Sequence, residues 1–442
     1  MKTKPQKQKS NKVNIVTLGC SKNLVDSEVL MNQLYASKIP VTHEQNKSDA
    51  NIVIVNTCGF VDLAKQESID TILAYADAKA SKQIDKLYVT GCLSQRYKNE
   101  LENEIPEVDG YFGTFDLPFL LQELNANYKH ELIGERPLLT TPNHYAYLKV
   151  SEGCNRTCAF CAIPLMRGQH VSKTMDTIVA EAKNLAKQGV KEIMLIAQEL
   201  TFYGIDISGK RQLPDLLRRL NNEVEGIEWI RLHYAYPHKF PLEIIEAMAQ
   251  CEKVCNYLDI PLQHISDPVL KRMRRLITQQ ETEQLILKIR DILPNIALRT
   301  TMLVGFPGET QQDIDQLAEF IQKIRFERMG IFQYSHEEGT FAGQNYPDDV
   351  PQEEKAMRAN QIMDIQAAIS AELNQQKIDN TYRVLFDRKE SDYFVGRTEF
   401  DSPEVDNEVL VDAKTQYARI GDFANVTIHE ATDFDLFGSI GC

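Results

Sequence analysis

The sequence predicts an α/β protein in three parts: an N-terminal parallel α/β sheet domain, a central partial barrel of six strand–helix units, and a small C-terminal antiparallel β-barrel. Short apolar, β-branched runs alternate with helical patterns in two successive series. From residue 375 onward, apolar and polar residues alternate between turn signals, without a helical period. At 442 residues, the chain is also too long for one ordinary core.

The composition is that of an ordinary globular protein, with 43% hydrophobic and 25% charged residues. A net charge of −14 argues against a nucleic-acid-binding role for the whole chain and favours a basic partner. No apolar run approaches the ~20 residues of a membrane-spanning helix, so we expect a cytoplasmic protein without a membrane partner. The basic residues 1–12 are predicted to be a disordered tail.

The first α/β series, residues 13–134, places a cysteine after each of three predicted strands. These cysteines are Cys20, Cys58 and Cys92. Because the carboxyl ends of parallel strands meet at one edge of a sheet, we expect the three thiols to lie together. The predicted strands are 13–18, 51–56, 86–90 and a weaker 110–114, and the helices are 24–37, 61–79 and 95–104.

A proline-containing linker, residues 135–143, leads into the second series, residues 144–349. Six strand–helix units predict an open or partial barrel, in which active sites lie at the carboxyl ends of the strands. Its predicted strands are 145–150, 192–197, 229–234, 257–261, 297–304 and 329–334, with helices at 173–188, 241–250, 279–293 and 311–324. Residues 350–374 form a predicted connecting helix, and residues 375–442 the small barrel.

Three further cysteines, Cys154, Cys158 and Cys161, follow the first strand of the second series in a C-x3-C-x2-C pattern. A closed structural zinc site uses four ligands. A cubane iron–sulfur cluster on three thiolates instead leaves one iron open, and that iron can take a small chelating molecule. A zinc site completed by His170, or simple surface thiols, are the alternatives, and the loop position and spacing favour the cluster.

The stretch CNRTCAFC resembles the signature of radical S-adenosylmethionine enzymes. The wider chain resembles the methylthiotransferase family of these enzymes, whose motifs it carries in family order along nearly its whole length. The motifs are TLGCSKNLVDSE (17–28), NTCGF (56–60), TGCL (90–93), EGCNRTCAFCAIPLMRG (152–168), LIAQE (195–199), YLDIPLQH (257–264) and LVGFPGET (303–310). One departure is RRLIT at 274–278, where the family pattern leads us to expect a glycine near 276–277.

The resemblance implies a transferase with a central radical-SAM domain and a TRAM-like barrel, using S-adenosyl-L-methionine and two 4Fe-4S clusters. Cys154, Cys158 and Cys161 would ligate the cluster that generates the radical. Cys20, Cys58 and Cys92 would ligate an auxiliary cluster, which also has an open iron. Adenosylmethionine would be used twice, once to methylate a sulfur and once to supply the radical that removes a substrate hydrogen.

Residues at the predicted strand ends are candidates for contact with adenosylmethionine, and each could equally serve the structure of its loop. The basic residues Arg272, Arg274 and Arg275 are expected to form a solvated face, and contact with the substrate or a reductant is the alternative. The candidate cofactor-binding residues are Phe160, Gln198, Glu199, Gly305 and Glu309, and Gln263 and His264 end a further strand.

Methylthiotransferases resembling this chain modify either hypermodified adenosines in transfer RNA or an aspartate in small-subunit ribosomal protein S-twelve. From residue 376 onward there are seven Lys or Arg and fourteen Asp or Glu, a net charge of −7. An acidic barrel suits a basic ribosomal protein, and RNA binding needs cations that are not grouped here. We therefore expect the ribosomal-protein branch, forming 3-methylthio-aspartate, without direct RNA binding.

The alternatives are a transfer-RNA methylthiotransferase and a non-catalytic iron–sulfur carrier. The resemblance also implies a flavodoxin- or ferredoxin-type reductant and a sulfur donor.

Overall fold

The computed structural model describes residues 11–45 and 49–441, and most of the predicted tail, residues 1–10, lies outside them. The chain divides into two compact units. Unit 1 comprises Met1–Thr140 together with Ile163–Gly168, and unit 2 comprises Thr141–Ala162 together with Gln169–Cys442. The short segment 163–168, which follows the second group of cysteines, therefore belongs to the N-terminal unit.

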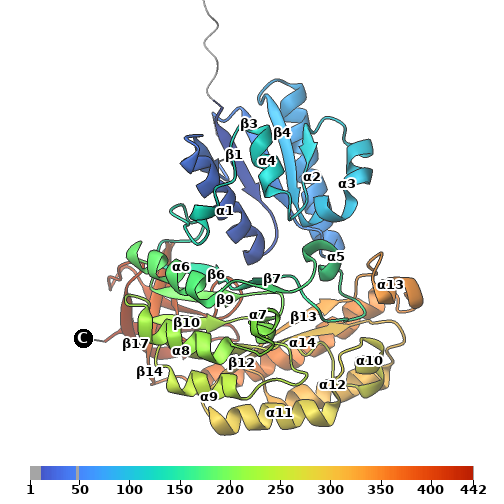
Figure 1. The fold of residues 1–442 in the computed structure, drawn as a ribbon. Helices are drawn as coiled ribbons and strands as arrows, with labels where there is room; N and C mark the ends of the chain where they lie inside the picture. The colour runs from blue at the N-terminus through green and yellow to red at the C-terminus, as the bar shows by residue number, and fades with distance from the viewer. Residues whose placement is uncertain (1–10, 46–48, 442) are drawn as a thin grey trace, which may run out of the picture. The chain divides into compact units, whose positions relative to one another are not determined.

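Unit 1 is a parallel five-stranded sheet in the order β2-β1-β3-β4-β5, with helices on both faces (Figure 1). The predicted strands are present, and β2 is an additional edge strand that pairs with β1. The strands are β1 Val13–Thr17, β2 Val41–His43, β3 Ile52–Thr57, β4 Lys86–Gly91 and β5 Gly110–Tyr111. The helices are α1 Ser21–Ala36, α2 Asp62–Ala80, α3 Cys92–Glu104, α4 Leu117–Glu123, α5 Ile163–Arg167 and the 3₁₀ helix η1 His130–Leu132.

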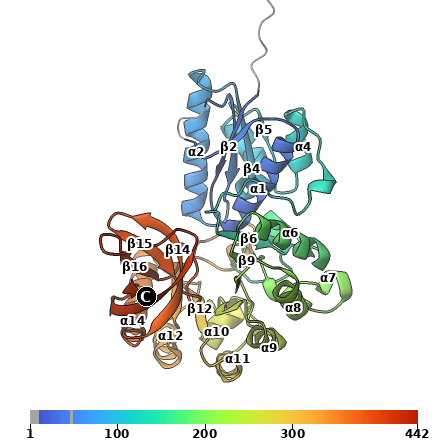
Figure 2. The same cartoon turned by 90° about the vertical axis from the view of Figure 1, so that its left-hand side faces the viewer.

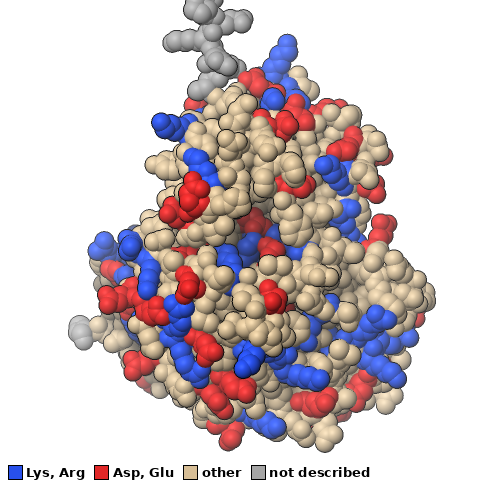
Figure 3. All heavy atoms as spheres, in the orientation of Figure 1, with Lys and Arg blue, Asp and Glu red and all other residues tan. Residues whose placement is uncertain are grey.

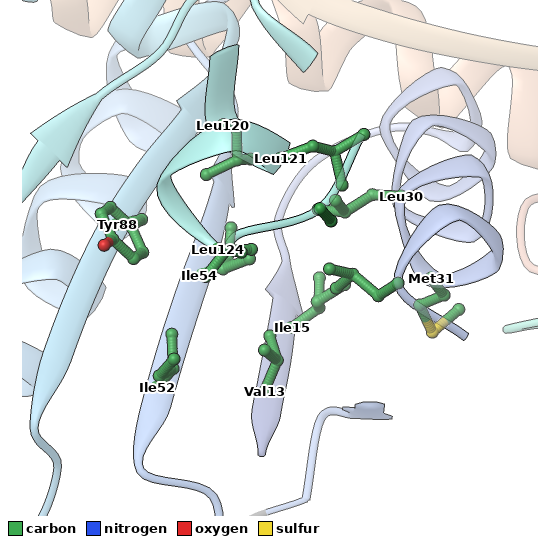
Figure 4. Close-up of a cluster of buried hydrophobic side chains, with 12 residues drawn as sticks. Val13, Ile15, Leu30, Met31, Ile52, Ile54, Tyr88, Leu120, Leu121 and Leu124 are labelled. Carbon is green, nitrogen blue, oxygen red and sulfur yellow. The ribbon is translucent and has the colours of Figure 1, made fainter. Parts of the chain in front are cut away.

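The three central strands of unit 1, β1, β3 and β4, are mostly apolar because both faces of the sheet are covered. Ile52 and Ile54 of β3 point to one face, where they pack with side chains of α1 and α4 (Figure 4). Val53 and Val55 point to the other face and pack with Ile72 of α2. This packing fixes the register of β3 between β1 and β4, and so fixes where each strand ends.

Unit 2 contains a second parallel sheet, with six strands in the order β13-β12-β11-β10-β9-β6. Each strand of this sheet pairs with the strand that comes before or after it among the six, as in an open barrel of strand–helix units. The predicted partial barrel is therefore confirmed. The strands are β6 Tyr145–Lys149, β9 Glu192–Ile196, β10 Trp229–Leu232, β11 Val254–Asp259, β12 Ala297–Val304 and β13 Arg328–Gln333, and β7 Ser151–Glu152 pairs with β8 Val171–Ser172.

Helices connect these strands and cover the outside of the sheet (Figure 1). The four predicted helices are present, and α8 and α10 are among those that the sequence did not predict. The helices are α6 Met175–Lys187, η2 Leu200–Phe202, α7 Ile205–Ser208, α8 Leu213–Glu223, α9 Glu243–Gln250, α10 Asp267–Arg272, α11 Gln279–Ile292, α12 Gln311–Ile324 and α13 Phe341–Asn345. None of the described helices is both long and apolar enough to cross a membrane.

The C-terminal part of unit 2 is a closed barrel, β14-β15-β16-β18-β17, preceded by the long helix α14 (Figure 2). The barrel was predicted to be antiparallel, and one detail differs: β16 and β18 pair in parallel. Strand β18 was not predicted. The elements are α14 Gln352–Gln375, β14 Thr381–Glu390, β15 Tyr393–Arg397, β16 Glu408–Asp412, β17 Phe423–Ala431 and β18 Asp435–Ile440.

Buried ion pairs join the barrel to the six-stranded sheet within unit 2. Glu192 of β9 pairs with Arg231 of β10 at 2.8 Å and with Arg397 of β15 at 2.5 Å. The ring of Trp229 packs edge-on against Phe423 of β17, with 4.8 Å between ring centroids. Buried ion pairs and an aromatic contact therefore hold the barrel against the amino-terminal ends of β9 and β10.

Candidate active site

The cysteines Cys20, Cys58 and Cys92 follow β1, β3 and β4, three strands that lie side by side in the sheet of unit 1. Thr57 of β3 is in register with Gly91 of β4, so Cys58 and Cys92 occupy equivalent positions just beyond the two strands. A Cβ atom added to Gly19 would lie 2.7 Å from the Cβ of Cys58. The structure thus brings the first cysteine group together at one sheet edge.

Two glycines permit this close approach. Gly19 and Gly91 have φ angles of +92° and +99°, a conformation that side-chain-bearing residues rarely adopt. A Cβ atom on Gly91 would collide with the backbone of Thr57 and the side chain of Asn56. The Gly-Cys pairs therefore have a physical reason: glycine makes the turn that presents the next residue's thiol.

Burial controls the ionisation of two thiols of this group, those of Cys58 and Cys92. Burial raises the pKa of Cys92 to about 12, although the Arg167 guanidinium opposes this shift. Burial likewise raises the pKa of Cys58. A metal ligand must be a thiolate, so a bound cluster has to supply the positive charge that replaces the thiol protons.

Arg167 approaches this first group from α5. Its Nε donates to the Cys92 sulfur at 3.2 Å, and its Nη1 donates to Asp26 Oδ2 at 2.6 Å. The other terminal nitrogen donates to Asn23 Oδ1. The sequence contains this residue in the motif IPLMRG, but we did not predict its contact with a cysteine that lies far earlier in the chain.

The second group, Cys154, Cys158 and Cys161, lies in the loop that follows β6 in unit 2. Two of its sulfurs accept hydrogen bonds. The backbone N–H of Arg156 donates to Cys154 Sγ at 3.4 Å, and Arg275 Nη1 donates to Cys158 Sγ at 3.3 Å. Such donors stabilise thiolates and tune the potential of an iron–sulfur cluster.

An aromatic clamp fixes this cysteine loop. The guanidinium of Arg156 lies between the rings of Phe202 and Tyr236, 3.8 and 3.9 Å from their centroids. Its Nη2 donates to Glu199 Oε2 at 2.8 Å. Further along, the Ala159 N–H donates to the Met273 carbonyl at 2.9 Å. The loop is therefore held from both sides before any cofactor binds.

The expectation of a solvated basic face at 272–275 is wrong. Arg275 is only 4% exposed and donates to the cysteine loop, and Arg272 donates to the Pro307 carbonyl at 2.8 Å. Arg274 lies over the ring of Phe341. The reason is that α10 ends at Arg272 and the chain turns back over the loop, which local charge pattern does not reveal.

Leu276 accounts for the missing family glycine. Its φ of +58° is in the left-handed region that glycine adopts without strain, and its side chain is 61% exposed. The chain therefore keeps the glycine-type turn at this position while carrying a leucine.

Gln198, at the end of β9, retains an open hydrogen-bond acceptor. Its Nε2 donates to Glu152, whose other carboxylate oxygen accepts from Lys149 Nζ at 2.6 Å. Within the described residues its Oε1 is buried and has no hydrogen-bond partner. A donor group of a bound molecule would satisfy this atom.

The carboxylates of Glu199 and Glu309 are engaged within the protein. Glu199 accepts from Arg156 and, at 2.8 Å, from the Thr201 N–H. Glu309 accepts from the Gly305 N–H at 2.8 Å and from Arg358 of α14 at 2.7 Å, and it lies 3.4 Å from His264. Both residues hold loops at the carboxyl ends of strands, and within the described residues the second oxygen of Glu309, Oε2, is buried without a hydrogen-bond partner.

Phe160 and Gly305 belong to the same region of unit 2. Phe160 is half-buried and lies edge-on to Phe306, with 6.5 Å between ring centroids. Gly305 has a φ of +74°, and a Cβ there would collide with the alkyl chain of Lys355. The other strand-end candidate, Gln263, takes a φ of +77° and bridges to β12 through its backbone.

The surroundings of the cysteines bear on which metal group they fit. Within the described parts of the chain, no three His, Cys, Asp or Glu side chains are grouped so that they could bind one metal ion. A four-iron cube binds each thiolate at a different corner and so needs them further apart than one tetrahedral zinc does. Three of the six cysteines are buried, Cys58, Cys92 and Cys154, and the N–H and guanidinium donors and the glycine turns around the two groups fit such a cube.

Comparisons with known proteins agree with this geometry. The model of the Radical SAM superfamily matches residues 148–321, that of the uncharacterized protein family UPF0004 matches residues 12–113, and that of the TRAM domain matches residues 378–440. A solved radical S-adenosylmethionine methyltransferase, TsrM from Kitasatospora setae, has a TM-score of 0.56 at 15% identity, covering 73% of each chain. The chain is therefore a radical SAM protein in fold.

Curated relatives define the family more narrowly. The ribosomal protein uS12 methylthiotransferase RimO of Cytophaga hutchinsonii is 59% identical over 437 residues, 99% of either chain. Those of Flavobacterium johnsoniae and Bacteroides thetaiotaomicron are 58% and 52% identical, covering 99% and 98% of this chain and 99% of each relative. The chain belongs to the RimO family of radical SAM methylthiotransferases.

Proposed function

We propose that this enzyme adds a methylthio group to the β-carbon of an aspartate in ribosomal protein uS12, the S-twelve protein of the small subunit. The observation that carries the proposal is the pair of cysteine groups, one at the carboxyl ends of three parallel strands and the other in the loop that follows β6. Family membership makes S-adenosyl-L-methionine and two 4Fe-4S clusters its cofactors. When bound, they supply one-electron cleavage of the sulfonium and a site for the sulfur that is transferred.

We propose Cys154, Cys158 and Cys161 as ligands of the radical-generating cluster, and Cys20, Cys58 and Cys92 as ligands of the auxiliary cluster. Hydrogen bonds to the sulfurs of Cys154 and Cys158 support the first assignment. The convergence of three strand ends supports the second. Each group supplies three thiolates, which leaves one iron of each cube for a small molecule.

For adenosylmethionine, we propose a site at the carboxyl ends of β6, β9 and β12. The unpartnered Oε1 of Gln198 is suited to a donor such as an amine or a ribose hydroxyl. Gly305 begins the turn that follows β12 at this edge of the sheet, and Phe160 presents a ring at the cysteine loop. Glu199 and Glu309 support this site by fixing the loops on either side of it.

The charge of the barrel supports a basic protein as substrate. Four of its acids are engaged within unit 2: Asp387 pairs with Arg397 of the barrel itself, Asp401 pairs with Arg328 of β13, and Glu399 and Asp406 accept hydrogen bonds from β11. Others lie on the barrel's outer surface, among them Glu390, Asp392, Glu430 and Asp433. On the face drawn in Figure 3, Lys and Arg are interspersed with Asp and Glu.

The reaction also requires partners that lie outside this chain. Reductive cleavage of adenosylmethionine consumes an electron, for which we propose a flavodoxin- or ferredoxin-type reductant, and the added sulfur requires a sulfur donor. A ribosomal-protein substrate implies that the enzyme acts in the cytoplasm.

The test is anaerobic incubation of the reconstituted, reduced enzyme with adenosylmethionine and an equal mixture of uS12 and transfer RNA. Mass spectrometry of both should show a gain of ~46 Da, the replacement of H by SCH3, on one aspartate of uS12. A gain on transfer RNA alone would overturn the substrate. Absence of 5′-deoxyadenosine would favour a non-catalytic carrier, and the Cys158→Ser variant is the matched control.

A further inference from the structure

One buried cation contacts the first cysteine group. Arg167 is only 4% exposed, yet its guanidinium reaches the Cys92 sulfur, Asp26 and Asn23 through three different nitrogens. These contacts fix both the position and the orientation of the planar group. A surface arginine paired with one carboxylate would not be held in this way.

Asn23 ties this arrangement to the strand ends. Its Nδ2 donates to the carbonyls of Leu18 and Thr57, at 2.7 and 3.0 Å, and its Oδ1 accepts from Arg167. The residue therefore links the turn before Cys20, the end of β3 before Cys58, and the arginine beside Cys92. The guanidinium is part of the framework that shapes the cysteine site.

The charge of an auxiliary cluster gives this arrangement a consequence. A 4Fe-4S core with a 2+ charge and three thiolates has a net charge of about −1, and reduction makes it more negative. In a buried site, a fixed cation and an N–H donor to a ligand sulfur favour the reduced state and hold the thiolate in place. Asp26 is 31% exposed, so solvent screens the opposing carboxylate more than it screens Arg167.

We propose that Arg167 is a positioning residue for the auxiliary cluster: its Nε–H bond to the Cys92 thiolate raises the cluster's reduction potential and slows the loss of its iron. This inference rests on the proposed assignment of Cys20, Cys58 and Cys92 as ligands.

The chain also connects Arg167 directly to the second cysteine group. Helix α5 begins at Ile163, two residues after Cys161, and its last residue is Arg167. Helix α5 belongs to unit 1, where Met166 is 1% exposed and its carbonyl accepts from Thr114 Oγ1 at 2.7 Å. The segment that carries the last ligand of one cysteine group therefore delivers a cation to the other group.

The test uses the full chain carrying Cys154→Ala, Cys158→Ala and Cys161→Ala, so that only the auxiliary cluster contributes. In this parent we compare Arg167→Gln, Arg167→Lys and, as the matched control, Arg136→Gln. Arg136 is an equally buried arginine of unit 1, 2% exposed, that pairs with Glu28. The readouts are iron per chain, the midpoint potential from an EPR-monitored redox titration, and the rate of iron loss to a chelator.

Arg167→Gln is expected to shift the midpoint to a more negative potential and to speed iron loss by about tenfold, since a hydrogen bond to a charged group is lost. Arg167→Lys keeps the charge but not the planar guanidinium, so its values should fall between those of the parent and Arg167→Gln. Arg136→Gln also breaks a buried ion pair but touches no cysteine, so it should keep the parent's midpoint potential.

Equal midpoints and rates in the parent and Arg167→Gln would overturn the inference. If Arg167→Gln and Arg167→Lys bind no iron while Arg136→Gln does, the positioning role is supported. A parent without iron would instead overturn the ligand assignment itself, which separates the two failures.

Discussion

The contact between the barrel and the six-stranded sheet depends on one carboxylate, that of Glu192. Replacing Glu192 tests whether its buried ion pairs hold the barrel in place. Glu192 is fully buried and pairs with Arg231 and Arg397, which are themselves 0% and 2% exposed at the side chain. Arg397 also pairs with Asp387 at 2.8 Å. In Glu192→Ala, Arg231 loses its carboxylate partner and Arg397 keeps only one.

The expected loss of stability follows from this burial. Removing one partner of a buried ion pair leaves an uncompensated charge and costs about 3–5 kcal/mol. The matched control is Glu408→Ala. Arg388 and Glu408 are 2.6 Å apart, similar to the Glu192 pairs, but their side chains are 45% and 31% exposed. A solvent-screened pair of this kind contributes at most about 1 kcal/mol, so burial rather than distance decides the difference.

Trp229 provides the assay. It is the one tryptophan in the sequence, is 5% exposed, and packs against Phe423 of the barrel. Its fluorescence during urea unfolding of the full chain under anaerobic conditions therefore reports on this interface. Glu192→Ala should lower the urea midpoint much more than Glu408→Ala does. Equal losses in the two variants would refute the argument that the buried pairs hold the barrel in place.

Three further outcomes are expected. Burial acts to raise the pKa of Asp401, but the positive charges of Arg328 and Lys377 outweigh it and hold that pKa below its ordinary value. The ionised Asp401 therefore stabilises the fold above about pH 4, and this stabilisation is lost as the pH falls through the lowered pKa. Trp229 fluorescence of the metal-free chain should show this loss, and Asp401→Asn should flatten it; an unchanged pH dependence would contradict the assignment. Glu309→Ala should weaken adenosylmethionine binding about tenfold or more in equilibrium dialysis, because the Gly305 loop loses its buried acceptor. Glu354→Ala, which removes only the partly exposed partner of Arg358, should bind as the parent does, and equal affinities for all three proteins would refute the loop's role. Leu276→Gly should raise stability by about 0.5–1 kcal/mol in the same urea assay, since it relieves a left-handed leucine; a loss would show that the leucine side chain contributes more than the strain costs.

Most strands of the two parallel sheets were predictable because strands buried on both faces are continuous apolar runs. The run at 51–56 corresponds to β3, Ile52–Thr57, every residue of which is buried. Strand β2, with the sequence VTH, has three half-buried residues and no such run, so the sequence contains no signal for it. Strand β18 closes the barrel by pairing in parallel with β16, a partner that its local pattern does not identify.

The cysteine positions were predictable for a topological reason: a residue after a parallel strand lies at the ligand-binding edge whatever the strand's length. The arginines beside them were not. Arg167 and Arg275 contact sulfurs of residues that precede them by 75 and 117 positions. Contacts of this kind depend on where α5 and the turn after α10 pack in the folded chain. The residues next to each arginine in the sequence do not predict that packing.

The iron content of the anaerobically reconstituted protein tests the central claim most directly. Two cubes on two groups of three thiolates predict about eight irons per chain. Replacing Cys20, Cys58 and Cys92 together by serine should leave about four, held by the loop after β6. A parent with no more than about four irons, or a triple variant that keeps the parent's full iron, would contradict the account.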